Sequence, residues 1–269
     1  MSEEATPSDE SLVAWLLRPV SPLLDILDDL GETTMLLGRT VTWGVRPPYR
    51  VGPLLAALDF IGAESTFIEL LVGLFTGMAF TLSTIVGFRQ FSAEGMVGGV
   101  VALGMARELA PVLAAVVLTA RAGSTMASEL GNMRVTEQID AITTMGVNPV
   151  QYLVLPRVVA TVLMLPLLAV CFAIAGMFGS YLVAVVWQNI DPGVFVDKVR
   201  QFVEMKDLRM MFTKSLVFAV IVSVICCKKG FHASGGARGV GEATARAVVA
   251  SIVMIFAADY VVSTIMTDL

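Results

Sequence analysis

Four ionisable residues lie inside long apolar runs, where a charge is costly unless it is paired or faces a cavity. They are Arg107 and Glu108 in one run, Lys214 in another and Asp259 in a third, and their formal charges sum to zero. Consecutive residues of a helix point about 100° apart, so Arg107 and Glu108 cannot simply pair with each other. We predict that Glu108 pairs with Lys214, that Arg107 is left to meet an anionic ligand, and that Asp259 moderates the local potential. The alternative is a purely structural network of charges that touches no ligand.

A second candidate is the polar stretch 121–157, which stands between two apolar runs of membrane length. Residues 124–144 contain no proline, and Gly146 followed by Asn148 and Pro149 is a typical helix stop. We therefore predict one short helix over 124–144, held at a membrane surface.

One face of this predicted helix carries charges of both signs. Four-residue spacing places these side chains on or beside one stripe: Glu129, Met133, Glu137, Asp140, Arg134 and Gln138. Such a face is either simply solvated or docked against a soluble protein. In the docked interpretation the helix is a lever that transmits force from a soluble motor to the two flanking spans.

The elements that must position these residues are membrane helices. The chain of 269 residues is 56% hydrophobic and 15% charged, which is too apolar for an ordinary soluble domain. A spanning helix needs about 20 mostly apolar residues. Five runs meet this requirement, at about 65–87, 96–120, 158–187, 210–227 and 246–266. The sequence thus predicts an all-α integral membrane protein with five transmembrane helices, the third of which can kink at Pro166.

The N-terminal region differs from the spans that follow it. Residues 1–10 are acidic and polar, do not form a signal peptide, and are expected to be disordered. Residues 11–45 mix Leu, Ile and Trp with charges at helical spacing, which favours one or two amphipathic helices along the membrane interface. The alternative is an ordinary helix that packs on a soluble partner. With a stiff connector at 46–53, residues 11–64 would precede a transmembrane unit over 65–269.

Lysine and arginine in the flanks indicate the orientation. With the N-terminus in the cytoplasm, eleven basic residues lie inside and six outside, which predicts a periplasmic C-terminus. The basic outer segment 188–209 weakens this bias, although its acidic residues balance the charge. Residues 195–208 are predicted to form a short amphipathic helix on the outer face. All four intramembrane charges then fall in the outer half of the bilayer.

Other patterns argue against chemistry in the chain itself. The glycine-rich segment 230–249 has no Lys–Ser/Thr after its glycines, so it predicts a tight turn before the fifth span, not a phosphate-binding loop. His232 is the only histidine and has no second ligand nearby, which leaves no metal site. The net charge of −5 does not suggest nucleic acid, and the three cysteines fit small buried residues. The sequence contains no nucleotide-binding motif. If this chain works against a gradient, its energy must therefore come from another chain.

The segment from Arg107 to Val158 and residues 230–249 resemble the MlaE/YrbE family of ABC-transporter permeases, over about residues 60–266. The resemblance implies a non-catalytic permease that works as a homodimer in the bacterial inner membrane. It also implies two cytoplasmic ATPase subunits that bind the ATP and Mg²⁺, so this chain needs no cofactor. A periplasmic partner with an MCE domain would exchange phospholipid or a related lipid with it.

The family's motifs are carried over only where residues match. The coupling motif between spans two and three falls on Glu129, Gly131, Met133, Arg134, Glu137 and Gln138, and the RE pair near the lipid cavity falls on Arg107 and Glu108. Lys214 and Asp259 fall where related permeases also carry charge, whereas Glu242 stands where a basic residue would be unsurprising. Two other functions remain open: an ion- or proton-coupled secondary transporter that uses the four charges, and a scaffold that recruits a cytoplasmic enzyme.

Overall fold

The computed structural model describes residues 21–44 and 51–267, and within these ranges every regular element is helical. It confirms the prediction of an all-α membrane protein with five spans. The helices long and apolar enough to cross a membrane are Val51–Arg89, Glu94–Val135, Val150–Trp187, Met205–Phe231 and Gly236–Met266. The first three are longer than the apolar runs that predicted them, because residues 51–64, 121–135 and 150–157 continue these helices.

Most of these spans are built from more than one element. The first comprises α3 (Val51–Leu58), η1 (Asp59–Ala63) and α4 (Glu64–Arg89), and the second η2 (Glu94–Met96), α5 (Val97–Gly104), η3 (Met105–Leu109), α6 (Ala110–Leu118), η4 (Thr119–Gly123) and α7 (Ser124–Val135). The third comprises η5 (Val150–Val154), α9 (Leu155–Tyr181) and η6 (Leu182–Trp187). The fourth and fifth spans are single helices, α11 (Met205–Phe231) and α12 (Gly236–Thr267). The boundary expected at residue 65 therefore lies inside one continuous helix that begins at Val51.

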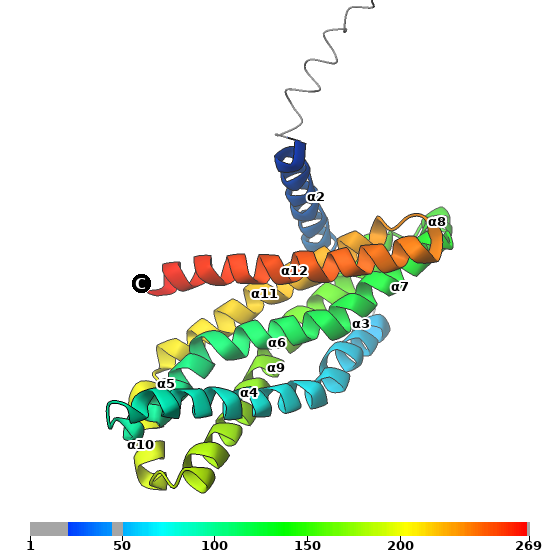
Figure 1. Cartoon of the computed structure of the whole chain (residues 1–269). Coiled ribbons are helices and arrows are strands. Elements are labelled where there is room, and N and C mark those ends of the chain that lie inside the picture. The colour runs from blue at the N-terminus through cyan, green and yellow to red at the C-terminus, as the bar shows by residue number, and fades with distance from the viewer. Residues whose placement is uncertain (1–20, 45–50, 268–269) are drawn as a thin grey trace, which may run out of the picture.

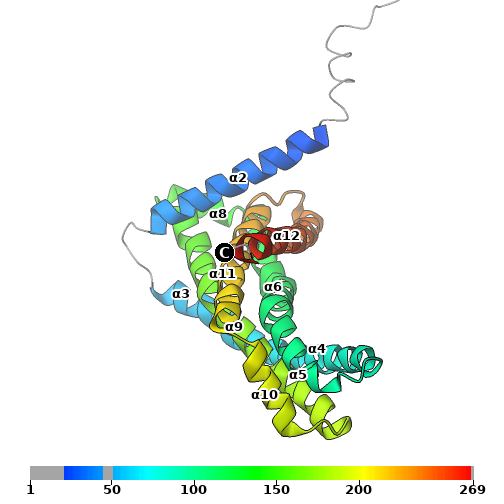
Figure 2. The same cartoon turned by 90° about the vertical axis from the view of Figure 1, so that its left-hand side faces the viewer.

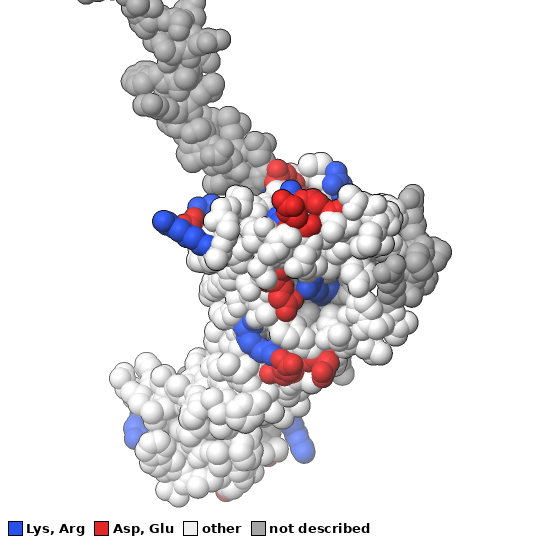
Figure 3. Space-filling model, turned by 90° about the vertical axis from the view of Figure 1, so that its right-hand side faces the viewer, with Lys and Arg blue, Asp and Glu red and all other residues white. Residues whose placement is uncertain are grey.

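The bundle has two distinct ends, which Figure 1 shows on opposite sides. One end, here the α8 end, carries the short helix α8 (Gln138–Thr144) and the turn between α11 and α12. The other, the α10 end, carries α10 (Pro192–Phe202) and the link between α4 and α5. On the face drawn in Figure 3, charged side chains gather over one half of the molecule, and the other half carries few. That distribution suits a helical bundle partly embedded in hydrocarbon.

Glycines let α4 and α9 approach closely, and these two helices form the most extensive pair in the described structure. A Cβ atom at Gly77 would lie 1.9 Å from the carbonyl oxygen of Gly176, and one at Gly73 would lie 2.6 Å from that of Phe172. The hydrophobic effect does not drive helices together in lipid. Small residues at the interface let the two backbones approach closely, and the resulting van der Waals packing stabilises the pair. The same glycines therefore set the distance between spans one and three.

The π-helical turns η1, η3, η4, η5 and η6 interrupt the first three spans. A π turn inserts one extra residue into an α-helix and locally frees backbone groups, and such turns occur frequently at functional sites. Arg107 and Glu108 lie in η3, and Arg121 lies in η4. Three charged residues of the second span, Arg107, Glu108 and Arg121, are thus placed where its helix is widened.

The polar stretch is not the single surface helix that we predicted. α7 continues the second span to Val135, and only α8 is a separate short helix. The chain turns at Glu137, whose φ of 60° lies in the left-handed region, which is uncommon for a residue other than glycine. Spacing alone gives no sign of this corner. The predicted stop is confirmed, since Gly146 has a φ of 77° and the Asn148 side chain accepts a hydrogen bond from the Val150 N–H (2.9 Å).

A single helix, α2 (Ser21–Gly44), covers the described part of the predicted amphipathic region 11–45. The predicted disordered tail 1–10 and the rest of residues 1–20 and 45–50 lie outside the described residues. Figure 2 shows α2 crossing the α8 end of the bundle. Leu36 and Leu37 pack there against a core cluster that includes Leu130 and Val154. The helix thus packs on this chain's own bundle.

The predicted amphipathic helix on the opposite side is α10, which ends at Phe202 and so is shorter than expected. Asp191 caps it by accepting from the Val194 N–H (3.0 Å), and Pro192 occupies its first turn. Its buried Phe195 packs on Gly98 of α5. α11 then begins with a capping box formed by Glu204 and Asp207.

Candidate functional site

Lys214 is the centre of a charge cluster that joins spans two, four and five. Its side chain is fully buried, and its Nζ atom lies 2.7 Å from Glu108 Oε2 and 2.8 Å from Asp259 Oδ1. The same ammonium group donates a hydrogen bond to the carbonyl oxygen of Arg107 (2.9 Å). The ammonium group thus makes two hydrogen bonds and a further ion pair with Asp259, which together offset the desolvation of a buried lysine. The predicted pairing of Glu108 with Lys214 is confirmed.

The backbone explains why an Arg107 carbonyl is available to Lys214. In an α-helix this carbonyl would accept from the N–H of residue 111, but residue 111 is a proline and has no N–H. The π turn η3 ends two residues before that proline. Lys214 supplies the missing donor, so the sequence Arg–Glu–Leu–Ala–Pro creates both the acidic and the backbone partner of the lysine.

Arg107 is not left without a protein partner, as the sequence had suggested. Its Nε atom donates to Asp207 Oδ1 at 2.6 Å, and the Asp207 side chain is only 1% exposed. Asp207 also caps α11 by accepting from the Glu204 N–H (2.8 Å). The Arg107 side chain keeps 32% of its surface exposed, so the protein covers it only in part. The cluster holds two cations and three carboxylates, a net charge of −1 where the four predicted residues sum to zero.

Two functional candidates were missed at the sequence level. Asp207 fell in the predicted amphipathic helix 195–208 on the outer face, although it lies seven residues before Lys214 and so shares a helix face with it. Glu69, in the first apolar run, was overlooked altogether. Its side chain is fully buried in α4, and neither carboxyl oxygen has a hydrogen-bond partner among the described residues. A buried carboxyl group without a partner is rare and marks a site worth testing.

The predicted docking residues gather at the corner between α7 and α8. Arg134 Nη1 donates to Asp140 Oδ1 across this corner (2.7 Å), and the Gln138 side chain donates to Thr136 (3.1 Å). Glu137 is exposed at the turn itself. These residues do not form the continuous helical stripe that we predicted, because the corner separates the part before Thr136 from α8.

The remaining predicted docking residues have other surroundings. Glu129 forms an ion pair with Arg157 of α9 (2.8 Å), and Met133 is half-buried. Gly131 is buried, and a Cβ atom there would lie 3.2 Å from both Ala233 and Val240. Gly131 therefore makes room for the turn before α12 and does not belong to the exposed face.

A hollow of about 300 Å³ lies between the corner and the turn that joins α11 to α12. It is lined by Arg134, Glu137 and Asp140 on one side and by residues 233–236 on the other. Of the turn predicted over 230–249, only residues 232–235 lie between the helices, because α12 already begins at Gly236; Gly235 and Gly236 both have positive φ angles. His232 contacts the Lys228 carbonyl oxygen (2.9 Å), and no group of described residues has the ligands for a metal ion.

A model of the permease MlaE family matches residues 54–265, which is most of the chain. The chain belongs to the MlaE permease family. A probable ABC transporter permease protein of Synechocystis sp. is 42% identical over 79% of this chain and 81% of its own length. One from Rickettsia bellii is 34% identical over 90% and 97%. A chloroplast protein of Arabidopsis thaliana, named trigalactosyldiacylglycerol 1, is 41% identical over 78% of this chain and 60% of its own length.

As an MlaE-family ABC transporter permease, this chain is a multi-pass membrane protein whose relatives are named for transport. Membership in an ABC transporter family implies an ATPase partner. The arrangement fits that division of labour, because the second span runs from Arg107 and Glu108 of the charge cluster to Arg134, just before the exposed corner. A movement of α7 would be transmitted along that helix to Arg107 and Glu108.

Proposed function

We propose that this permease moves phospholipid, or a related lipid built on diacylglycerol, through the membrane. The observation that carries the proposal is an apolar hollow of about 420 Å³ between α4 and α5. Phe80, Phe88, Phe91 and Val100 line it together with Thr84 and Gly87. Walls of this kind suit acyl chains. The chloroplast relative supports the same substrate class, since its name contains a galactosylated diacylglycerol.

The charge cluster would act on the lipid headgroup. Arg107 would bind the phosphate with the guanidinium donors that Asp207 leaves unused, since a planar guanidinium can bond phosphate at two points. Lys214, Glu108 and Asp259 would hold the surrounding helices and shape the polar wall of the path. In this proposal Asp207 orients Arg107 and lowers the net attraction of the site for anions.

The corner between α7 and α8 would be the contact for the ATPase. Arg134, Glu137, Gln138 and Asp140 would form the exposed part of this contact, and Glu129 would brace α7 against α9. ATP and Mg²⁺ would bind in the partner, so ATP hydrolysis there would move α7. We expect Asp140→Asn, which breaks the 2.7 Å pair with Arg134, to weaken ATP-driven transport while leaving the membrane bundle intact.

The assembly that we propose contains two copies of this chain, two ATPase subunits and a periplasmic protein with an MCE domain. The complex would lie in the bacterial inner membrane with the α8 end in the cytoplasm and the C-terminus in the periplasm. The excess of basic residues on the α8 side supports this orientation. Labelling of single cysteines placed in α8 and in α10 by a membrane-impermeant thiol reagent tests it, and labelling of α8 from the periplasm would contradict it.

Reconstitution tests the lipid proposal. The complex with its ATPase is placed in liposomes, and ATP-dependent transfer of a labelled phospholipid is measured. The double variant Arg107→Gln/Asp207→Asn keeps the site free of an unpaired buried charge, and we expect it to transfer lipid about tenfold more slowly, the equivalent of one lost charge-assisted hydrogen bond. Arg89→Gln, at the same end but exposed, is the control. Equal transfer by both variants would remove Arg107 from the lipid site.

A secondary transporter that uses the intramembrane charges is the alternative. It would couple movement of its substrate to an ion or proton that moves down its own gradient, and it would need no ATPase. Reconstitution of this chain alone separates the two functions: gradient-driven transport by the isolated chain would contradict the ABC mechanism, and activity only with ATPase and ATP supports it.

A further inference from the structure

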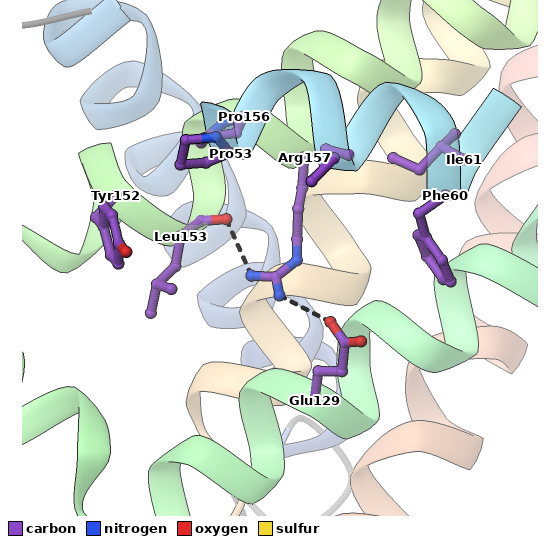
Figure 4. Close-up of a pocket in the computed structure, with 10 residues that line it drawn as sticks. Pro53, Phe60, Ile61, Glu129, Tyr152, Leu153, Pro156 and Arg157 are labelled. Carbon is purple, nitrogen blue, oxygen red and sulfur yellow. Dashed lines mark hydrogen bonds and ion pairs between the residues drawn. The ribbon is translucent and has the colours of Figure 1, made fainter. Parts of the chain in front are cut away.

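A third hollow, distinct from the one at the α7–α8 corner, lies at the α8 end, away from the charge cluster around Lys214. Its volume is about 360 Å³, and it opens between α3 with η1, the start of α9, and α7. Figure 4 shows the Arg157 guanidinium extending between the residues of α3 and Glu129 on α7. No part of the proposed lipid path or of the α7–α8 corner uses this space.

The walls of the hollow are apolar, and it exists because the residues on its α3 side are small. Pro53, Ala56 and Ala57 face it from α3, and Pro156 bounds it at the start of α9. Phe60, in η1, closes the α3 side where the helix changes to a π turn. A space of this size with mostly apolar walls is typical of a binding site for a small or chain-like apolar group.

The polar edge of the hollow carries one charge of each sign. Arg157 Nη2 lies 2.8 Å from Glu129 Oε2, and Arg157 Nη1 donates to the Leu153 carbonyl oxygen (3.0 Å). The arginine side chain is 17% exposed and the glutamate side chain 50%. A guanidinium group has five N–H donors and a carboxylate accepts about four hydrogen bonds, so this pair retains capacity for a ligand.

The position of the hollow matches the headgroup layer of a bilayer. Glu129 lies near the end of the second span, which stops at Val135, Arg157 lies near the start of the third, which begins at Val150, and α3 is the first element of the first span. Apolar walls below a pair of opposite charges are complementary to an amphiphile whose headgroup also carries both charges. An anionic headgroup would fit less well, because Glu129 would repel it.

We propose that this hollow binds a zwitterionic glycerophospholipid, with its phosphate at Arg157 and its ammonium group at Glu129. One acyl chain would lie along Ala56 and Ala57. Because Glu129 lies on α7 and Arg157 on α9, the bound lipid would bridge the two spans next to the α7–α8 corner. The site needs only that the chain lies in a membrane, so it does not depend on the identity of the transported lipid.

The first experiment compares headgroups on the purified full-length chain. Native mass spectrometry measures binding of phosphatidylethanolamine, phosphatidylglycerol and diacylglycerol with identical acyl chains. We expect phosphatidylethanolamine to bind about tenfold more tightly than either of the others, the difference made by one charge-assisted contact. Equal binding of diacylglycerol would mean that no headgroup is recognised, and tighter binding of phosphatidylglycerol would mean that Glu129 does not take part; either result overturns the proposal.

Matched variants then locate the site. Ala56→Trp fills the hollow from an exposed position that lines it, whereas Leu55→Trp places the same side chain on the adjacent, 60% exposed residue that does not line it. We expect only Ala56→Trp to abolish the preference for phosphatidylethanolamine. Glu129→Gln should shift the preference toward phosphatidylglycerol, and it carries the test if Ala56→Trp does not fold. An unchanged preference in Glu129→Gln, or equal binding by the two tryptophan variants, overturns the proposal.

Discussion

Replacement of Lys214 by methionine should destabilise the bundle strongly, because this one ammonium group is shared by three oxygen atoms. Methionine keeps an unbranched side chain that is one atom shorter than lysine, and it removes the charge and its donors. Removal of one partner from a buried ion pair costs about 3–5 kcal/mol, mainly because the remaining charge stays buried. Lys214 is fully buried and Asp259 is 18% exposed, so we expect the cost to fall in this range.

The exposures of the two carboxylates predict which second substitution rescues the variant. Glu108 is 47% exposed and can be solvated when the lysine is lost, whereas Asp259 cannot. Asp259→Asn in the Lys214→Met background should therefore recover most of the stability, and Glu108→Gln should recover less than about 1 kcal/mol. An exchange of Glu108 with Lys214 should not restore stability, because it would place a carboxylate beside Asp259.

Thermal unfolding of the purified chain in one detergent measures these differences. At about 2–4 °C per kcal/mol, Lys214→Met should lower the melting temperature by an amount on the order of 10 °C. A melting temperature close to that of the wild type would refute the argument that the ammonium group holds three spans together. A larger rescue by Glu108→Gln than by Asp259→Asn would refute the assignment of the cost to Asp259.

Two further outcomes are expected in the first span. Gly77→Ala should push α4 away from α9 and lower the free energy of unfolding by about 1–3 kcal/mol or more, because the added Cβ meets a backbone carbonyl that cannot move aside. Gly87→Ala is the control: a Cβ there meets no atom within 4 Å, so stability should be unchanged or slightly higher. The melting temperatures of the two variants check this. Glu69→Gln removes the possibility of a buried charge and should preserve folding, whereas Glu69→Lys should prevent it. The yield of monodisperse protein distinguishes the two variants. Equal yields would mean that α4 opens to water at this position.

The class of fold and the five spans follow from the sequence because membrane spans are specified by local composition. Five runs of apolar residues predict five helices, and a run long enough to cross hydrocarbon has no alternative structure there that satisfies its backbone. Helix stops are equally local, as Gly146 and the pair Asn148–Pro149 show. The partnership of Glu108 with Lys214 was also predictable, because few opposite charges exist in the apolar runs and each needs a partner.

The tertiary structure alone decided the corner at Glu137, the pairing of Arg107 with Asp207 and the isolation of Glu69. Spacing predicts a continuous helix through residue 137, since nothing local marks a left-handed residue. Asp207 lies at the start of α11 in a segment whose pattern predicts a surface helix, and only the packing of α11 against η3 brings it to Arg107. Composition determines which segments enter the membrane, whereas the faces that meet there depend on glycine contacts and π turns that bring residues about 100 positions apart within hydrogen-bonding distance.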